Sequence, residues 1–266
     1  NRKHSFPTRR SSDLVAGTRF LAALAVGVDV AATLGIAATG EMRFFRPATC
    51  GGFGATAALA SLAGLDAART LDAFGIVHGA TAGTMQAHVE GSPVLGLQIG
   101  LAARSAVTAA SLASAGFPGP RAVLTGRYGH FPLFENGEAD LDWPIECLGH
   151  KWRIAELSHK PFPSGRLTHG VVDALMRLME DEDVSPDDIA HVKAIVPPLV
   201  HRLVGRPDVP RPEANYAKLC LPFVAGTYLA RGRVDVPDFA GRESLEDPVV
   251  HGFAARVEVV RDANPD

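Results

Sequence analysis

Three side chains suited to handling a carboxylate lie close together in the segment KPFPSGRLTH, residues 160–169. The segment carries Lys160, Arg166 and His169 just before a predicted helix. Pro161 and Pro163 restrict the backbone to extended conformations, so the segment should hold its cations in fixed directions. Lysine and arginine can bind a carboxylate, and histidine can move a proton near neutral pH. A solvated hinge is the alternative interpretation.

A glycine-rich segment in the first half is a second candidate site. Residues 46–66 read RPATCGGFGATAALASLAGLD, which we interpret as a glycine-rich turn that leads into a helix. Thr49 could cap that helix, Gly51 would leave backbone N–H groups accessible, and Arg46 stands just before them. Free N–H groups at the start of a helix favour an anion. The alternative is a tight turn that serves only helix packing.

The sequence lacks the motifs that mark several other classes of protein. It contains no GxSxG, HExxH or Walker motif, and the spacing of its glycines differs from a dinucleotide-binding fingerprint. The ten histidines and three cysteines show no paired spacing, so we expect no metal site and no disulfide framework. A net charge of −3 gives no argument for nucleic-acid binding.

Composition and length predict an ordinary globular protein of two domains. The 266 residues are 47% hydrophobic and 21% charged. The apolar stretch over residues 20–38 contains Asp29, so we expect an internal helix rather than a signal peptide or a membrane span. These features predict a cytoplasmic protein. Residues 1–14 resemble translated sequencing-adapter sequence, and we expect them to be non-native and to contribute nothing to the fold.

Helical periodicity dominates the first half of the chain. We expect helices over residues 15–35, 48–65, 67–78 and 97–115. In the first of them Phe20, Leu24, Val28 and Ala31 form an apolar stripe. Gly64 should adopt a left-handed conformation after the second helix, and Asp66 should cap the third. An all-α helical domain is therefore predicted for residues 15–155.

The second half mixes helical and strand periodicity. We expect a helix over residues 170–180, a helix start at 185–188 and a helix over 213–231 that Pro222 kinks. Strands are expected over residues 152–157, over 192–196 and toward the end of 249–260, where Ala255, Val257 and Val259 alternate with polar residues. A smaller α+β lid domain is therefore predicted for residues 156–266.

Four blocks of the sequence, in this order and spacing, resemble the MmgE/PrpD family, which includes 2-methylcitrate dehydratases and cis-aconitate decarboxylases. The blocks are RPATCGGFGATAALASLAGLD, GLQIGLAARSAVTAASLASAGFPGP, KPFPSGRLTHGVVDAL and NYAKLCLPFVAGTYLARGRV. The resemblance implies a helical domain with a smaller α+β lid, a homodimer, and an active site that uses no metal or organic cofactor. It also implies loss of water or carbon dioxide from a small polycarboxylate.

The resemblance implies roles for residues that match the motifs of the family. Lys160 and His169 are expected to be catalytic. The residues expected to bind substrate are Arg46, Thr49, Gly51, Gln98 and Arg166. We expect a 2-methylcitrate dehydratase-like hydro-lyase of propionate metabolism. The alternatives are a cis-aconitate decarboxylase-like activity and a non-catalytic relative that dimerises or binds a ligand.

The sequence departs from the family pattern at several positions. Arg46 stands where relatives carry histidine before Pro-Thr, Leu95 and Gln98 stand where they carry lysine and histidine, and Phe223 replaces tyrosine. A site with fewer cations suggests a substrate with fewer carboxylates. Motifs expected upstream of Val15, including the general base, and the end of the lid are not in the sequence. We therefore expect this chain to be an inactive fragment of an active enzyme.

Overall fold

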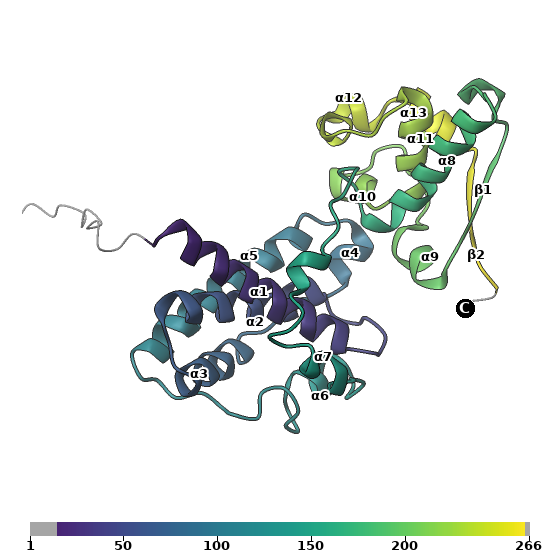
Figure 1. Cartoon of the computed structure of the whole chain (residues 1–266). Coiled ribbons are helices and arrows are strands. Elements are labelled where there is room, and N and C mark those ends of the chain that lie inside the picture. Colours follow the sequence, from purple (N-terminus) through teal and green to yellow (C-terminus); the bar gives the residue numbers. More distant parts are fainter. Residues whose placement is uncertain (1–14, 264–266) are drawn as a thin grey trace, which may run out of the picture. The chain divides into compact units, whose positions relative to one another are not determined.

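The computed structural model describes residues 15–263 and divides the chain into two compact units (Figure 1). Unit 1 contains the described residues up to Met85 together with Gly96–Leu157. Unit 2 contains Gln86–Leu95 and the residues from Ser158 onward. The chain is mostly helical, and a small two-stranded sheet lies in its C-terminal part, so the predicted fold class is confirmed. The predicted adapter-derived segment lies outside the described residues.

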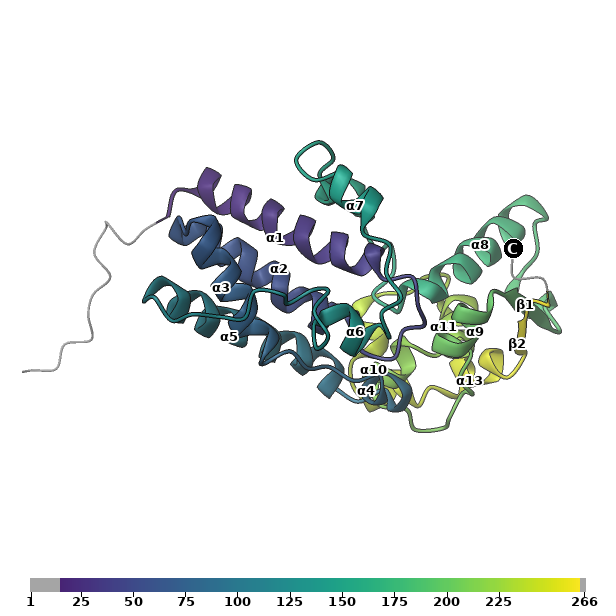
Figure 2. The ribbon, with the colours of Figure 1, turned by 90° about the horizontal axis from the view of Figure 1, so that it is seen from below.

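Long helices form the body of unit 1. They are α1 (Gly17–Ala37), α2 (Arg46–Ala63), α3 (Ala67–His78) and α5 (Val94–Ser114), with shorter α6 (His130–Phe134), α7 (Asp142–Glu146) and the 3-10 turn η2 (Arg153–Glu156). Helices α1 and α2 lie side by side in both views (Figures 1 and 2). The helix ends follow local chemistry that the sequence predicted. Asp66 caps α3 by accepting a 2.8 Å hydrogen bond from the backbone of Arg69, and Gly64 ends α2 at φ 67°.

Small residues form the contact between α1 and α2: Gly27 and, from the predicted apolar stripe, Ala31, whose Cβ would lie 2.7 Å from a Cβ on Gly54. Gly27 and Gly54 meet so closely that a Cβ on Gly54 would lie 2.4 Å from the Gly27 carbonyl oxygen. Phe20 and Leu24 are instead exposed, Phe20 by 53%. Most faces of α1 are apolar, so hydrophobicity alone did not predict which face packs against α2. The face that lets the two backbones approach most closely is the one in contact.

The glycine-rich segment is also part of a helix rather than a turn. Helix α2 begins at Arg46, with a proline in its first turn, where no backbone N–H is needed. Thr49 and Gly51 therefore lie inside α2, and the residue before the helix is Phe45, whose side chain makes no capping hydrogen bond. The predicted set of free N–H groups around Gly51 is wrong, because helix hydrogen bonds use them.

Unit 2 is built around the buried helix α11 (Leu221–Arg231). Two strands, β1 (Val192–Val196) and β2 (Val257–Arg261), pair in parallel with Val192 opposite Val257. The connection between the strands carries helices, as parallel pairing requires. The remaining elements are α4 (Gln86–Glu90), η3 (Arg166–Thr168), α8 (His169–Asp181), η4 (Pro186–Asp188), α9 (Pro198–Val204), α10 (Ala214–Lys218), η5 (Val236–Phe239), α12 (Arg242–Leu245) and α13 (Pro248–Ala254).

Four elements of the sequence prediction need correction. Residues 152–157 form the turn η2 and no strand, because the backbone N–H of Arg153 is bound by buried Asp29 of α1 at 2.9 Å. The helix start at 185–188 is a capping box on a single 3-10 turn, η4. Residues 213–231 form two helices, since Pro222 lies in the first turn of α11 and begins that helix instead of kinking it.

The fourth correction concerns residues 249–260, which form most of a helix and the start of a strand. Asp247 accepts a 2.9 Å hydrogen bond from the backbone of Val249 and so caps α13, which extends to Ala254. The strand β2 starts only at Val257, so Ala255 precedes it. Alternation of side chains could not separate the end of the helix from the start of the strand, because Phe253 and Val257 are both buried.

Two helices, α1 and α5, are long and apolar enough to cross a membrane by length and composition. This is weak support for a membrane span, because core helices of soluble proteins share that composition. In α1, Gly27 packs against α2 and Asp29 binds the backbone of η2. The expectation of no membrane partner stays a prediction.

Candidate functional site

A cavity of about 430 Å³ lies in unit 2, beside the segment that carries the predicted catalytic residues. It is lined by Ser158, His159, Pro161, Phe162, Arg166, Leu167, His169, Gly170, Asp173 and Val200. The volume is in the range that suits a small ligand. The structure therefore places Arg166 and His169 on one cavity, and Lys160 lies between two residues that line it.

Local contacts fix the course of this segment. The hydroxyl of buried Ser164 lies 2.8 Å from the hydroxyl of Thr168, and the backbone N–H of Gly165 donates to the carbonyl of Lys218 at 2.7 Å. A Cβ on Gly165 would lie 2.8 Å from a methyl carbon of Leu219, so glycine permits the close approach. The turn η3 then leads directly into α8, whose first residue is His169. Anchoring of this kind holds the side chains around the cavity in place.

His169 has the chemical properties of a proton acceptor. Its ring packs edge-on against Phe162, with centroids 5.4 Å apart, and its buried Nε2 has no hydrogen-bond partner among residues 15–263. Burial lowers the pKa of His169 below its ordinary value, and the nearby charges of Lys160 and Arg166 lower the pKa further. Hydrogen bonds that the ring donates to the backbone of Ser164 and Phe162 oppose this shift only in part. At neutral pH the imidazole is therefore neutral, with a lone pair available.

The two cations differ in how far the protein already uses them. Lys160 Nζ donates to the carbonyl oxygen of Ser164 at 3.3 Å. The Arg166 guanidinium makes no ion pair within the described part of the chain, residues 15–263. Asp173 lines the same cavity but pairs with Arg177 at 3.0 Å. Arg166 and Lys160 thus place two cations in or beside the lining of a cavity where the carboxylate of Asp173 already has a partner, an arrangement suited to an anion.

In unit 1, the predicted substrate-binding Arg46 is committed to an internal ion pair. Its Nη2 and Nε bind the carboxylate of Glu135 at 2.7 and 3.1 Å, and Nη2 also donates to the carbonyl of Gly40 at 2.8 Å. The Glu135 side chain is 1% exposed and that of Arg46 is 18% exposed. A substrate carboxylate would have to compete with Glu135, and the binding role of Arg46 stays a prediction.

The other predicted binding residues of unit 1 are Gln98, Thr49 and Gly51. The Gln98 amide binds the backbone of Thr84 on both sides, at 2.6 Å through its oxygen and 3.3 Å through its nitrogen. Thr49 is fully buried, with its hydroxyl 4.0 Å from Cys50 Sγ. Gly51 is partly exposed, and a Cβ there would meet nothing within 4 Å. The substrate-binding roles of Gln98, Thr49 and Gly51 stay predictions.

A buried group of neutral side chains lies near the Arg46–Glu135 pair. His130 is fully buried between the rings of Phe53 and Phe134, and its Nε2 lies 3.9 Å from Cys50 Sγ. Burial lowers the pKa of His130 to about 4, and burial also raises the pKa of Cys50 to about 11. Both groups are therefore uncharged at neutral pH, so the pair is no activated thiolate.

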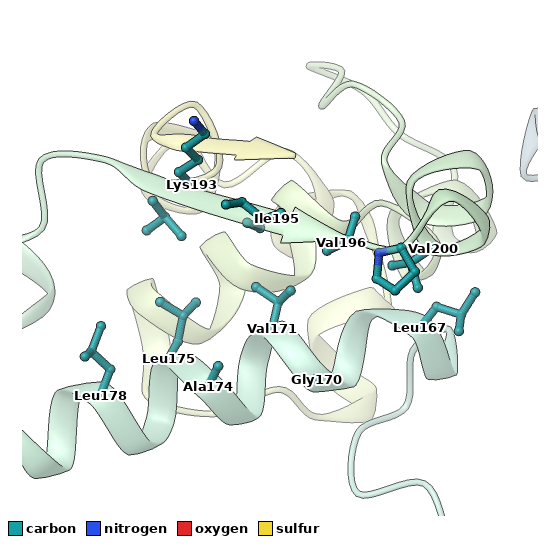
Figure 3. A pocket seen from close by; sticks show the side chains of 13 residues that line it. Leu167, Gly170, Val171, Ala174, Leu175, Leu178, Lys193, Ile195, Val196 and Val200 are labelled. Carbon is teal, nitrogen blue, oxygen red and sulfur yellow. The ribbon is translucent and has the colours of Figure 1, made fainter. Parts of the chain in front are cut away.

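A second cavity, of about 440 Å³, is mostly apolar and lies between α8 and β1. Figure 3 shows Val171 and Leu175 of α8 pointing toward the strand, with Lys193 pointing away from the helix. A cavity with this lining offers little to bind a carboxylate. The cavity beside His169 is the better candidate site.

Sequence reasoning missed residues in both candidate regions: His159 and Asp173 at the cavity, and Glu135 beside Arg46. His159 and Asp173 line the cavity, and both left a usable signal: His159 directly precedes the KPFP motif, and Asp173 lies one helical turn after His169. Glu135 left no such signal, because it lies 89 residues from Arg46. Among residues 15–263, no three His, Cys, Asp or Glu side chains gather as metal ligands would. The metal-free site stays a prediction.

Comparison with known proteins identifies the family. Residues 6–142 match the MmgE/PrpD N-terminal domain, and residues 162–266 match the MmgE/PrpD C-terminal domain. The two matches cover most of the chain in the expected order. The chain therefore belongs to the MmgE/PrpD family.

Two individual proteins are similar to the chain over part of their length. The chain is 28% identical to the human cis-aconitate decarboxylase over 224 residues, which is 82% of this chain and 45% of that protein. It is 33% identical over 178 residues to the cis-aconitate decarboxylase-like protein oryM of Aspergillus oryzae, which is 63% of this chain and 37% of that protein. The chain thus spans less than half the length of either relative.

Proposed function

We propose that the protein to which this chain belongs is a lyase that acts on a small polycarboxylate, with Arg166, Lys160 and His169 in its active site. The observation that carries the proposal is the cavity beside His169. It combines an arginine without an ion pair among residues 15–263 with a histidine whose Nε2 is buried and unpaired within the same residues. Family membership supports the same class of reaction.

The chemistry assigns each side chain a step. In a hydro-lyase, a base removes a proton from the carbon next to a carboxylate, and an acid gives a proton to the hydroxyl group of the neighbouring carbon, which leaves as water while the double bond forms. We propose that His169, in place of the base expected upstream of Val15, takes that proton on Nε2, since it is neutral at neutral pH. Arg166 and Lys160 would hold the carboxylates and offset the charge that develops on the carbon acid. These steps need neither a metal nor an organic cofactor.

Decarboxylation is the second candidate, and the names of the two relatives favour it. In that reaction the carbon–carboxylate bond breaks, carbon dioxide leaves, and a proton is delivered to the carbon. A protonated His169 could then act as the acid, although the lowered pKa of His169 suits a base better. The released product, water or carbon dioxide, distinguishes the two reactions.

The predicted binding residues Arg46 and Gln98 of unit 1 offer a substrate carboxylate little free charge. The charge of Arg46 is already met by Glu135, and the Gln98 amide is held by the backbone of Thr84. We therefore propose a dicarboxylate or tricarboxylate rather than a more highly charged acid. We also propose a homodimer in the cytoplasm, and the buried free thiols of Cys50 and Cys220 are compatible with a reducing compartment.

The test uses the full-length protein and a screen of small polycarboxylates, with carbon dioxide and alkene products measured separately. On the substrate found, His169→Gln should lower kcat/KM by about 10²–10⁴-fold, as loss of a proton-transfer group does. Lys160→Ala should lower it by about 30- to 1,000-fold, which corresponds to ~2–4 kcal/mol of transition-state stabilisation.

Two matched variants control for charge and fold. Arg211→Ala removes an exposed cation that pairs with Glu246 in the same unit, and His191→Gln removes an exposed histidine that pairs with Glu258. Both should retain activity within about twofold, since exposed substitutions have small effects. If His169→Gln and Lys160→Ala keep full kcat/KM while melting normally, this cavity is not the active site. Binding without any turnover would favour the non-catalytic relative.

A further inference from the structure

His251 of α13 is held between two hydrogen-bond acceptors. Its Nδ1 lies 2.6 Å from Oδ2 of Asp208, and its Nε2 lies 3.0 Å from the carbonyl oxygen of Leu245. A carbonyl oxygen and an ionised carboxylate can only accept hydrogen bonds. Both ring nitrogens must therefore carry a hydrogen, which makes the imidazole of His251 a cation.

The surroundings of His251 favour that charge. Asp208 faces the ring from the loop between α9 and α10, and Asp247 faces it from the start of α13. Asp247 in turn pairs with Arg231 of α11 at 2.9 Å, and the ring of Phe223 packs edge-on at 5.6 Å. Tyr216 and Cys220 interact with Asp208 from its other side, and both are uncharged at neutral pH because their pKa values are raised.

These contacts outweigh the cost of burying the ring. Burial lowers the pKa of His251, but the hydrogen bonds to Asp208 and to the Leu245 carbonyl, together with the charges of Asp208 and Asp247, raise it above the ordinary value. The side chains of His251 and Asp208 are 18% and 19% exposed, so water still reaches the pair. The proton can therefore leave when the pH rises.

We propose that His251 is a pH-sensitive clamp that joins α12 and the α9–α10 loop to α13 when it is protonated and releases α12 when it is neutral. A neutral imidazole carries a single N–H and can serve only one of the two acceptors. Oδ1 of Asp208 is buried and has no partner within residues 15–263, so Asp208 depends on the Nδ1–H of His251. The single hydrogen stays with Asp208, and a lone pair of Nε2 then faces the Leu245 carbonyl.

The released element borders a polar cavity of about 680 Å³. Residues of α12 and the turn after it line that cavity together with Arg231, Arg233 and Pro248. Arg242 of α12 also pairs with Glu213, which ends the same loop that carries Asp208. Loosening of α12 would thus alter the shape and charge of this cavity. The proposal is independent of the lyase assignment, because it concerns other residues of unit 2.

The test measures ring nitrogen shifts and amide exchange by NMR on the full chain. The ring of His251 should show two protonated nitrogens at about pH 7.5, which lies above the ordinary histidine pKa of about 6.5. Between about pH 6 and about pH 9, the protection factors of amides in residues 242–247 should fall roughly three- to tenfold, the change expected from one hydrogen bond. Amides of α8 should keep their protection.

Variants separate the clamp from general effects of pH. His251→Gln should remove the pH dependence of residues 242–247, and Asp208→Asn should lower the pKa of His251 while the fold is kept. His191→Gln should change neither. The clamp is refuted if His251 titrates at or below the ordinary histidine value, or if the protection factors of residues 242–247 do not change with pH. Should His251→Gln fail to fold, the Asp208→Asn titration decides alone.

Discussion

In helix α2, Gly54 makes the contact with α1 and the Arg46 guanidinium is held by Glu135. In the segment of residues 160–169, Gly165 makes a similarly close contact, with Leu219, but Arg166 has no ion pair among residues 15–263. Both segments combine glycine with a cation, and both were interpreted from the sequence as parts of a carboxylate site. Their surroundings give them different roles, because one cation is neutralised and the other lines a cavity.

The difference lies in partners that are distant in sequence. Glu135 reaches Arg46 from 89 residues away, and no local pattern marks it as that partner. The two histidines of these regions differ in the same way. His130 is sealed among aromatic rings, whereas His169 lines a cavity beside two cations. A motif therefore predicts which side chains are near one another, but packing decides whether they remain available for a ligand.

The largest effect on stability is expected from breaking the Arg46–Glu135 pair. Glu135→Ala leaves a mostly buried guanidinium without its carboxylate, and the free energy of unfolding should fall by about 3 kcal/mol, the low end for buried pairs because Arg46 is partly exposed. Urea unfolding measures the change.

The matched control for this prediction is Arg121→Ala, which breaks the ion pair between Arg121 and Asp72 in the same unit. The Arg121 side chain is 54% exposed, so the loss should stay below about 1 kcal/mol. Equal losses from the two variants would mean that Glu135 holds Arg46 no more firmly than a surface partner would. The contrast between the two cationic segments would then disappear.

The sequence predicted the fold class and many helix ends, because these depend on nearby residues. Asp66 and Gly64 mark the start of α3 and the end of α2 through their own backbone preferences. The strand predicted at residues 152–157 was wrong, since buried Asp29 of α1 binds the backbone at Arg153 and holds a turn. For the candidate site, the sequence pointed to Lys160, Arg166 and His169 in one short segment, and Arg166 and His169 line one cavity, while their roles stay predictions. It could not show that Arg46 is neutralised, because that depends on tertiary contacts.

The buried histidine of unit 1 should make stability depend on pH. The pKa of His130 is lowered to about 4, so the unfolded chain binds this proton as pH falls through about 6.5 while the folded chain does not. The contribution is complete above that pH and is lost as pH falls toward 4, by on the order of 3 kcal/mol. Urea unfolding across this range should show the slope.

His130→Phe tests this assignment, because it keeps an aromatic ring in the same place and removes the proton site. The variant should flatten the dependence on pH between about 4 and 6.5, whereas His191→Gln on the surface should leave it unchanged. A slope that persists in His130→Phe would place the titrating group elsewhere and remove the distinction between the two histidines.

The smallest of the stability effects concerns the glycines of α2. Gly54→Ala places a Cβ against the Gly27 carbonyl oxygen and Ala31, and it should cost about 1–3 kcal/mol of unfolding free energy through overpacking. Gly51→Ala on the same helix meets nothing within 4 Å and should instead stabilise by about 0.5–1 kcal/mol. Thermal unfolding compares the two. If both variants stabilised the chain, or both destabilised it, the contact with α1 would not explain why α2 contains these glycines.

The most direct test of the central claim is an NMR titration of the histidine rings of this chain with citrate, a tricarboxylate probe. The account predicts that the His169 ring shifts and that its pKa rises as the anion offsets the charges of Lys160 and Arg166, while the His130 ring stays unchanged. Arg166→Ala should remove the response, and Arg211→Ala, which removes an exposed cation outside the cavity lining, should preserve it. A His169 ring that is unaffected by citrate, or a response confined to His130, would contradict the assignment of the site to the segment of residues 160–169.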